Sequence, residues 1–179
     1  MRPLFVDVDT QNDFVLPAGS LYAPGAERVI PKVEALNRLA AERQLGLIST
    51  ACAHEENDAE FLVWPPHCVK GTVGQLKPNS TLVGVGQILF EKQHTDVFLD
   101  TRFVPLLNEM GATEYVVFGV VTEVCVRFAA EGLLRMGKPV TIVGDAVCAL
   151  SEPAAQNFLE RFIQAGGRVC DSAEIRIRF

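Results

Sequence analysis

Short runs of β-branched and other apolar residues alternate with longer amphipathic stretches along almost the whole chain. Apolar runs of this length are typical of strands buried on both faces, and the longer stretches have the 3.6-residue spacing of helices that cover a sheet. We therefore predict an α/β fold, a three-layer sandwich with a six-stranded, mostly parallel sheet between helices. The 179 residues fit one domain, 1–179, without a linker or an internal repeat.

The expected strands cover residues 4–9, 45–50, 87–92, 114–120, 139–145 and 168–172. The expected helices cover residues 26–43, 101–111, 122–137 and 151–167. Residues 51–86 break this rhythm with several prolines and glycines, so we expect a long excursion over the carboxyl ends of the strands. Connections of this length in a compact domain usually carry function.

Composition excludes several classes of partner. A net charge of −6 provides no basic surface for nucleic acid or an anionic membrane. The apolar run at the N-terminus is too short for a signal peptide, and none approaches the roughly 20 residues that span a bilayer. We therefore expect a cytoplasmic protein that acts on a small molecule, and leave a homo-oligomer open. The odd number of cysteines, five, favours free thiols in a reducing compartment.

Cys125 occupies a special place in this pattern, just after the expected strand 114–120. If Thr122 caps the next helix, Cys125 lies in its first turn, at the edge of the sheet where ligands bind. The positive end of the helix dipole would lower the pKa of the thiol there. The residues alone leave open whether Cys125 is a nucleophile or a small buried hydrophobe.

Asp9 and Lys92 end the first and third expected strands, so both should lie at the same edge as Cys125. A thiol, a proton acceptor and a cation together make an activated nucleophile. A structural ion pair between Asp9 and Lys92 fits the spacing equally well. Asp7 and Asp13 lie close by in the sequence, and spacing does not decide which acid serves.

Four segments, "VDTQNDF", "GSLYAPGA", "LFEKQHTDVFLDT" and "GVVTEVCV", resemble the signatures of the isochorismatase-like cysteine hydrolases, in order and over nearly the whole chain. The resemblance implies a catalytic triad of Asp9, Lys92 and Cys125 and a six-stranded parallel sheet between helices. It also implies a cis peptide bond between Val120 and Val121, and an oxyanion hole formed by the backbone N–H groups of Val121 and Cys125.

A further segment, "WPPHCVKGTVG" at residues 64–74, is similar to a stretch of the nicotinamidases that binds a divalent metal and the pyridine ring. The resemblance implies substrate-binding roles for Phe14, Trp64 and Val120. It implies metal-binding roles for Cys52, His54 and His67. Cys52 stands where the family has an aspartate, and a thiolate would favour zinc over manganese or magnesium. The alternative is a decayed metal site, with His54 only an exposed loop residue.

The resemblance implies a cysteine amidohydrolase of pyridine nucleotide metabolism that converts nicotinamide and water to nicotinate and ammonia through a thioester on Cys125. One alternative is a metal-independent hydrolase of another small amide or carbamoyl compound. Another, from a different class, is a thiol redox or small-molecule-binding protein without hydrolase activity. A vinyl-ether hydrolase of the isochorismatase type uses no such thiol, so Cys125 argues against that reaction.

Overall fold

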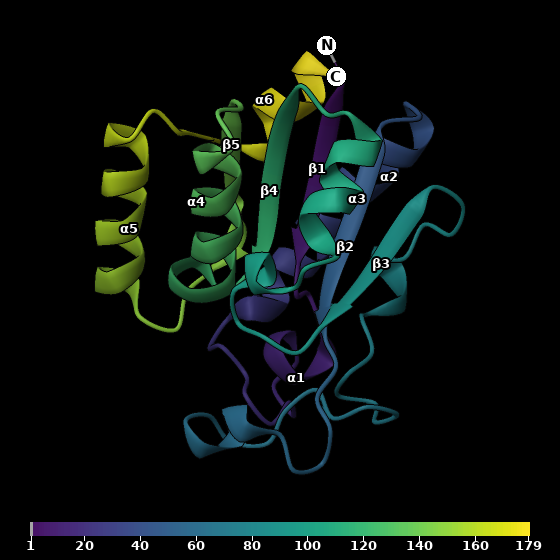
Figure 1. The fold of residues 1–179 in the computed structure, drawn as a ribbon, viewed down its shortest axis with the longest axis vertical. Helices are drawn as coiled ribbons and strands as arrows, with labels where there is room; N and C mark the ends of the chain where they lie inside the picture. Colours follow the sequence, from purple (N-terminus) through teal and green to yellow (C-terminus); the bar gives the residue numbers. More distant parts are fainter. Residues whose placement is uncertain (1) are drawn as a thin grey trace.

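A six-stranded sheet forms the centre of the protein, and the computed structural model describes residues 2–179 (Figure 1). The strands are β1 (Pro3–Val8), β2 (Gly46–Cys52), β3 (Gln87–Lys92), β4 (Glu114–Val120), β5 (Val140–Cys148) and β6 (Arg168–Cys170). Their order across the sheet is β3-β2-β1-β4-β5-β6, and every neighbouring pair is parallel. The predicted fold class is therefore confirmed.

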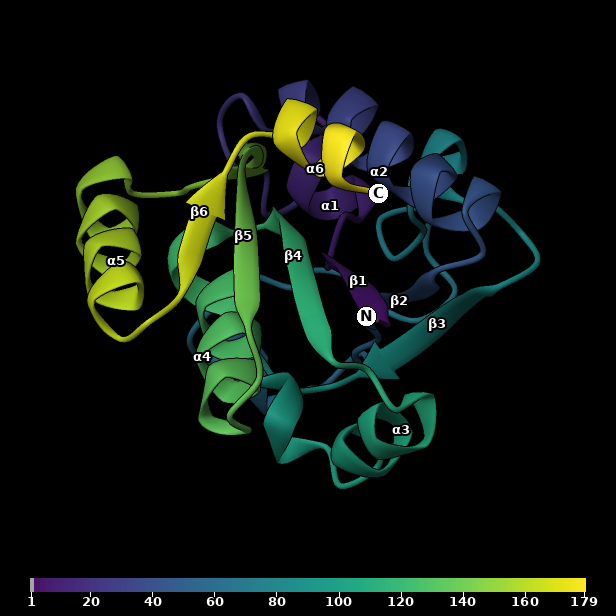
Figure 2. The ribbon, with the colours of Figure 1, turned by 90° about the horizontal axis from the view of Figure 1, so that it is seen from above.

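Helices cover both faces of the sheet (Figure 2). One face carries α2 (Ile30–Glu42) and α6 (Ser172–Arg178), and the other carries α3 (Phe103–Met110), α4 (Arg127–Arg135) and α5 (Glu152–Gln164). The short helix α1 (Asn12–Val15) follows β1. Single 3-10 turns are found at η1 (Ala26–Val29), η2 (Ala59–Leu62), η3 (Asn79–Thr81) and η4 (Val97–Leu99). Helix α6 has no counterpart among the expected helices.

The core has two halves because successive side chains of a strand point to opposite faces of the sheet. Phe5 of β1 belongs to the half under α2 and α6, where its ring packs edge-to-face on Phe118 at 6.1 Å between centroids. Val6, the next residue, belongs to the half under α3, α4 and α5. All six residues of β1 and all seven of β4 are buried, as two-sided burial requires.

The segment after β4 differs from the expected helix 122–137. A π-helical turn, η5 (Thr122–Val126), comes first, and α4 begins only at Arg127. The N-cap is Val121, in an extended conformation, and Thr122 makes no side-chain capping bond. The prediction that Thr122 caps the helix is therefore wrong, because the chain enters the turn one residue earlier.

Residues 53–86 form the long connection between β2 and β3, with only η2 and η3 as regular turns. Its first part lies beyond the carboxyl ends of the strands at the bottom of Figure 1, and η3 and the residues after it pass beside α2 to the start of β3. Three consecutive polar residues after β1 hold this connection. The Gln11 side chain bonds the backbone N–H and C=O of Cys52 and the carbonyl of Gln75, while Asn12 donates to the carbonyl of Val73. Asp13 accepts from the backbone N–H of Cys68 at 2.7 Å. The side chains of the "QND" sequence therefore fix the path of the long connection next to the end of β1.

No helix within residues 2–179 is both long enough and apolar enough to cross a lipid bilayer.

Candidate active site

The structure brings Asp9, Lys92 and Cys125 to one end of the sheet. Asp9 follows the last residue of β1, Lys92 is the last residue of β3, and Cys125 lies in the turn after β4. Cys52, the last residue of β2, is the register partner of Lys92. Because all strands are parallel, their carboxyl ends share one edge, which is where side chains of an α/β active site converge.

Asp9 and Lys92 form a buried ion pair, with 2.8 Å between Oδ2 and Nζ and almost no exposure of either side chain. Thr50 of β2 holds the other carboxylate oxygen, since its hydroxyl donates to Oδ1 at 2.6 Å. The backbone N–H of Asp9 donates to the carbonyl of Thr50, and Asp9 has a positive φ of 47°. Aspartate tolerates this left-handed conformation better than most residues, so the carboxylate can turn back over the strand ends.

The charges of this pair are stabilised by each other. Burial acts to raise the pKa of Asp9, but the charge and hydrogen bond of Lys92, together with Thr50, hold that pKa below its usual value. Burial likewise acts to lower the pKa of Lys92, and Asp9 outweighs it, so this pKa lies well above its usual value. Lys92 Nζ also donates to the carbonyl of His94 at 3.0 Å and to Sγ of Cys52 at 3.2 Å. Both side chains are therefore ionised at neutral pH.

Cys125 does not have the lowered pKa that its place near a helix N-terminus predicted. Burial raises the pKa of its thiol well above the usual value; Lys92 opposes this shift, and Asp9 adds to it. The prediction failed because the dipole argument considers only the helix, whereas the pKa depends on everything packed around the sulfur. The resting thiol is therefore protonated, and an attack by its sulfur on a substrate requires a base.

The backbone before Cys125 has one of the features that the resemblance implied. The peptide bond between Val120 and Val121 is cis. The carbonyl of Val121 accepts from the N–H groups of Val124 and Val126, both at 3.2 Å. In a regular α-helix the carbonyl of Val121 would accept from the N–H four residues ahead, which is that of Cys125. Here it accepts from the N–H groups three and five residues ahead instead.

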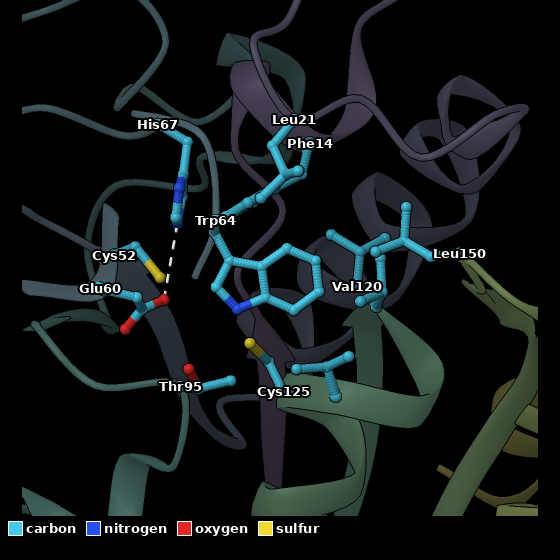
Figure 3. A pocket seen from close by; sticks show the side chains of 12 residues that line it. Phe14, Leu21, Cys52, Glu60, Trp64, His67, Thr95, Val120, Cys125 and Leu150 are labelled. Carbon is cyan, nitrogen blue, oxygen red and sulfur yellow. Dashed lines mark ion pairs between the residues drawn. The ribbon is translucent and has the colours of Figure 1, made fainter. Parts of the chain in front are cut away.

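A pocket opens above Cys125 and contains all three predicted substrate-binding residues, Phe14, Trp64 and Val120 (Figure 3). The indole of Trp64 crosses the middle of the pocket, with the Cys125 sulfur on one side and His67 and Cys52 beyond it. Leu21 and Leu150 complete the apolar wall. A flat, largely apolar ligand with one polar group near Cys125 suits such a lining.

Cys52 and His67 also line this pocket, and with His54 they form a cluster whose ligand atoms all lie within 4.8 Å of one another. His54 is fully buried, so the alternative of an exposed loop residue is wrong. Nδ1 of His54 lies 2.9 Å from the Asp58 carboxylate, and Nδ1 of His67 lies 2.8 Å from the carbonyl of Pro65. These contacts leave Nε2 of each ring for the cluster, and Nε2 of His54 is buried without a hydrogen-bond partner among the described residues.

This donor set fits a divalent metal. One sulfur and two imidazole nitrogens are ligands that zinc binds well, and outer carboxylate or carbonyl partners typically orient such imidazoles. Burial, together with the charge of Asp9, raises the pKa of Cys52 to about 12, so its thiol keeps its proton until a cation replaces it.

Sequence reasoning missed two polar residues of this pocket. Oε1 of Glu60 lies 3.7 Å from Nε2 of His67 and 4.0 Å from Nε2 of His54, which places a carboxylate beside the cluster. Thr95 lines the pocket near Cys125 (Figure 3). The 3-10 turn η2 positions Glu60, and its only local signal is Asp58, whose side chain caps the turn by accepting from the N–H of Glu60 at 2.9 Å. Cys68, which follows His67 in the chain, is not part of the cluster.

Comparison with known proteins places this geometry in a family. The family model described as "Isochorismatase domain" matches residues 3–174. A nicotinamidase/pyrazinamidase of Mycobacterium tuberculosis is 29% identical over 189 residues, covering 96% of this chain and all of that protein. The crystal structure of a Pyrococcus horikoshii pyrazinamidase in complex with zinc has a TM-score of 0.89 and 27% identity, covering 96% and 99% of the two chains.

An N-carbamoylsarcosine amidase from Thermoplasma acidophilum has a similar structure, with a TM-score of 0.86, 26% identity, and 96% and 97% coverage. These proteins share the whole length of the fold with the present chain. Because the family model spans nearly every residue from β1 into α6, the chain belongs to the isochorismatase family.

Proposed function

We propose that this protein is a cysteine amidohydrolase that converts nicotinamide and water to nicotinate and ammonia. The observation that carries the proposal is the meeting of the Asp9–Lys92 pair with Cys125, which lines a pocket that Cys52 and His67 of the three-residue cluster also line. The similarity to nicotinamidase and pyrazinamidase sequences and structures supports the choice of substrate. A planar heteroaromatic amide also suits the apolar walls formed by Phe14 and Trp64.

Acylation begins with a neutral thiol, because the pKa of Cys125 is raised. Asp9 takes the thiol proton as sulfur attacks the carbonyl carbon of the amide, so no free thiolate has to accumulate. Lys92 keeps Asp9 ionised before this step and remains beside it afterwards. The N–H groups of Val121 and Cys125 donate to the oxygen that becomes negative in the tetrahedral intermediate.

Release of ammonia returns the proton from Asp9 to the leaving nitrogen as the carbon–nitrogen bond breaks. This leaves a thioester on Cys125 and an ionised Asp9. Water then attacks the thioester, with Asp9 again taking a proton, and the second tetrahedral intermediate collapses to free the carboxylic acid. Asp9 finally returns its proton to the Cys125 sulfur, which restores the resting enzyme.

Cys52, His54 and His67 would hold a divalent metal, which we propose to be zinc, with Glu60 beside them. Such an ion supplies a Lewis-acid site for the ring nitrogen of the substrate and so orients the carboxamide. The chain itself contributes the orientation of the two imidazoles through Asp58 and the carbonyl of Pro65. The thiol of Cys52 in place of an aspartate favours a soft cation over manganese or magnesium.

A second candidate is the hydrolysis of another small amide or carbamoyl compound without a metal. The replacement of the expected metal-binding aspartate by Cys52 favours it, because a buried thiol with a pKa of about 12 is a poor ligand for hard cations. The structural similarity to an N-carbamoylsarcosine amidase supports the same reaction class with a different substrate.

The test is ammonia release from nicotinamide by the purified protein, compared with Cys125→Ala and with the matched control Cys170→Ala. Cys170 is also buried but lies in β6, outside the pocket lining. We expect turnover in the wild type and the control and none in Cys125→Ala. No ammonia under any metal condition would refute the nicotinamide assignment, and reversible oxidation of Cys125 without turnover would instead favour a redox protein.

The metal is tested separately from turnover. Cobalt(II) bound to a thiolate gives a sulfur-to-cobalt absorption band in the near ultraviolet, and we expect this band in the wild type and its loss in Cys52→Asp. Binding of cobalt without the band would contradict ligation by Cys52. Turnover that is unchanged after removal of all metal would favour the metal-independent candidate.

A further inference from the structure

A second buried ion pair lies beside the proposed active site, between Asp7 of β1 and Lys77 of the 53–86 connection. The atoms Oδ2 and Nζ are 3.1 Å apart, and the side chains are 0% and 3% exposed. Neither residue lines the pocket, and the proposed reaction uses neither. A buried ion pair is a weak source of stability, because the loss of hydration offsets most of the attraction. Stability alone therefore does not account for the Asp7–Lys77 pair.

The Asp7 carboxylate joins four separate parts of the chain. Oδ1 accepts from the Thr10 hydroxyl at 2.6 Å, and Oδ2 accepts from the Ser49 hydroxyl at 2.9 Å and from the Asn37 amide at 3.1 Å. These donors come from the turn after β1, from β2 and from α2, and Lys77 adds the long connection. With its hydrogen bonds satisfied, Asp7 is a fixed negative charge, and Lys77 is the cation that compensates it.

Thr50 links this second pair to Asp9. Its carbonyl accepts a hydrogen bond from the backbone of Asp9 at 3.1 Å and lies 3.5 Å from Nζ of Lys77. Its hydroxyl donates to the Asp9 carboxylate at 2.6 Å. Asp7 and Asp9 are two residues apart, about 7 Å along an extended strand. An uncompensated charge on Asp7 would therefore act on the group that holds Asp9 and on Asp9 itself.

We infer that Lys77 is a positioning residue, which neutralises the charge of Asp7 so that this charge does not displace Thr50 and Asp9, and Asp9 can take the proton of Cys125. The inference deepens the proposed amide hydrolysis, and its kinetic measurement rests on that function. A purely structural alternative is that Lys77 only ties down the connection that carries His54, Trp64 and His67. The two roles differ in what happens when both charges are removed together.

The experiment compares Lys77→Met with the neutral pair Asp7→Asn/Lys77→Met in the full-length protein. Lys32→Met is the matched control, because Lys32 also pairs with an aspartate, Asp145 at 2.9 Å, but near the surface. The first readout is the rate at which iodoacetamide alkylates Cys125, followed by peptide mass spectrometry. This rate needs no knowledge of the substrate, so failure of the nicotinamide assignment leaves it intact. The second readout is kcat and KM for the amide.

We expect Lys77→Met to slow alkylation of Cys125 about tenfold or more, since small displacements of a proton acceptor have effects of this size. We expect kcat to fall with it and KM to change less than about twofold. The neutral pair should recover most of both rates, and Lys32→Met should match the wild type.

Equal losses in Lys77→Met and in the neutral pair would overturn the inference, because charge compensation would then be irrelevant. A rise in KM alone would overturn it in favour of the structural tether. If Lys77→Met does not fold, the neutral pair decides by itself. Alkylation within about threefold of the wild type supports the inference, and a tenfold loss refutes it.

Discussion

Replacement of Thr50 by valine removes one hydroxyl group from the proposed catalytic carboxylate and changes little else in the shape of the side chain. The hydroxyl donates to Oδ1 of Asp9 at 2.6 Å in a site with no exposure to solvent. A hydrogen bond to a buried charge contributes about 1.5–3 kcal/mol. The loss should stay within this range, because Lys92 still compensates the other oxygen of Asp9 at 2.8 Å.

We expect Thr50→Val to lower the free energy of unfolding by about 1.5–3 kcal/mol in urea titrations, with an unchanged m-value. We also expect kcat to fall about tenfold with KM unchanged, since Thr50 orients Asp9 but does not line the pocket. Thr141→Val is the matched control, because Thr141 is also a buried strand threonine outside the pocket. A change in stability below about 0.5 kcal/mol in Thr50→Val would refute this account of how Asp9 is held.

Three further predictions concern other parts of the same framework. Lys92→Met should lower the free energy of unfolding by about 3–5 kcal/mol, because it leaves the buried Asp9 carboxylate without its cation. Urea unfolding measures this loss, and the double variant Asp9→Asn/Lys92→Met should recover part of it. Gly119→Ala should cost about 3 kcal/mol or more, since a Cβ there would lie 2.1 Å from the carbonyl oxygen of Val8 at a φ of 114°; a wild-type melting temperature would contradict this. Asp145 should contribute to a loss of stability in acid. Burial acts to raise its pKa, but bonds from Lys32 and Ser172 lower it below its usual value. The unfolded chain therefore takes up the proton first, and the free energy of unfolding falls as the pH drops below about 5. Asp145→Asn should lose about 1 kcal/mol at pH 7 and show a shallower decline in acid.

The sheet was largely predictable because its strands are short apolar runs, and β1 and β4 at its centre are buried on both faces. The runs of β3 and β4 are bounded by polar or turn-forming residues, and their observed limits, Gln87–Lys92 and Glu114–Val120, agree with the predicted ones, although β3 is a partly exposed edge strand. Helix α6 was missed because its two isoleucines, Ile175 and Ile177, alternate with charged residues, and only Ile175 is buried. A short helix with one buried contact has little periodicity to detect.

The positions of the site residues at the strand ends were predictable from the sequence. The positions of those in the long connection were not. The positions of Asp9 and Lys92 follow from the parallel order of β1, β2 and β3, whereas Glu60 reaches His67 only through the path of η2. The pKa of Cys125 was predicted in the wrong direction, because residues distant in the sequence bury the sulfur and oppose the effect of the helix end. Local sequence therefore determined which groups meet, and tertiary packing determined their protonation.

The site is built from two parts of the chain, the edge of the sheet and the connection between β2 and β3, and these parts differ in how far their sequences can vary. The thiol, the carboxylate and the ammonium group come from a rigid sheet edge, while Trp64 and His67 come from the connection between β2 and β3, which contributes no strand to the sheet. Gln11 and Asp13 bond to backbone groups of Gln75 and Cys68 in that connection, and these bonds do not depend on the side chains at those positions. The pocket-lining side chains of residues 53–86 can therefore be replaced only where the backbone attachments and Lys77 are kept. Grafts that keep both would be expected to direct the same nucleophile to amides of other shapes.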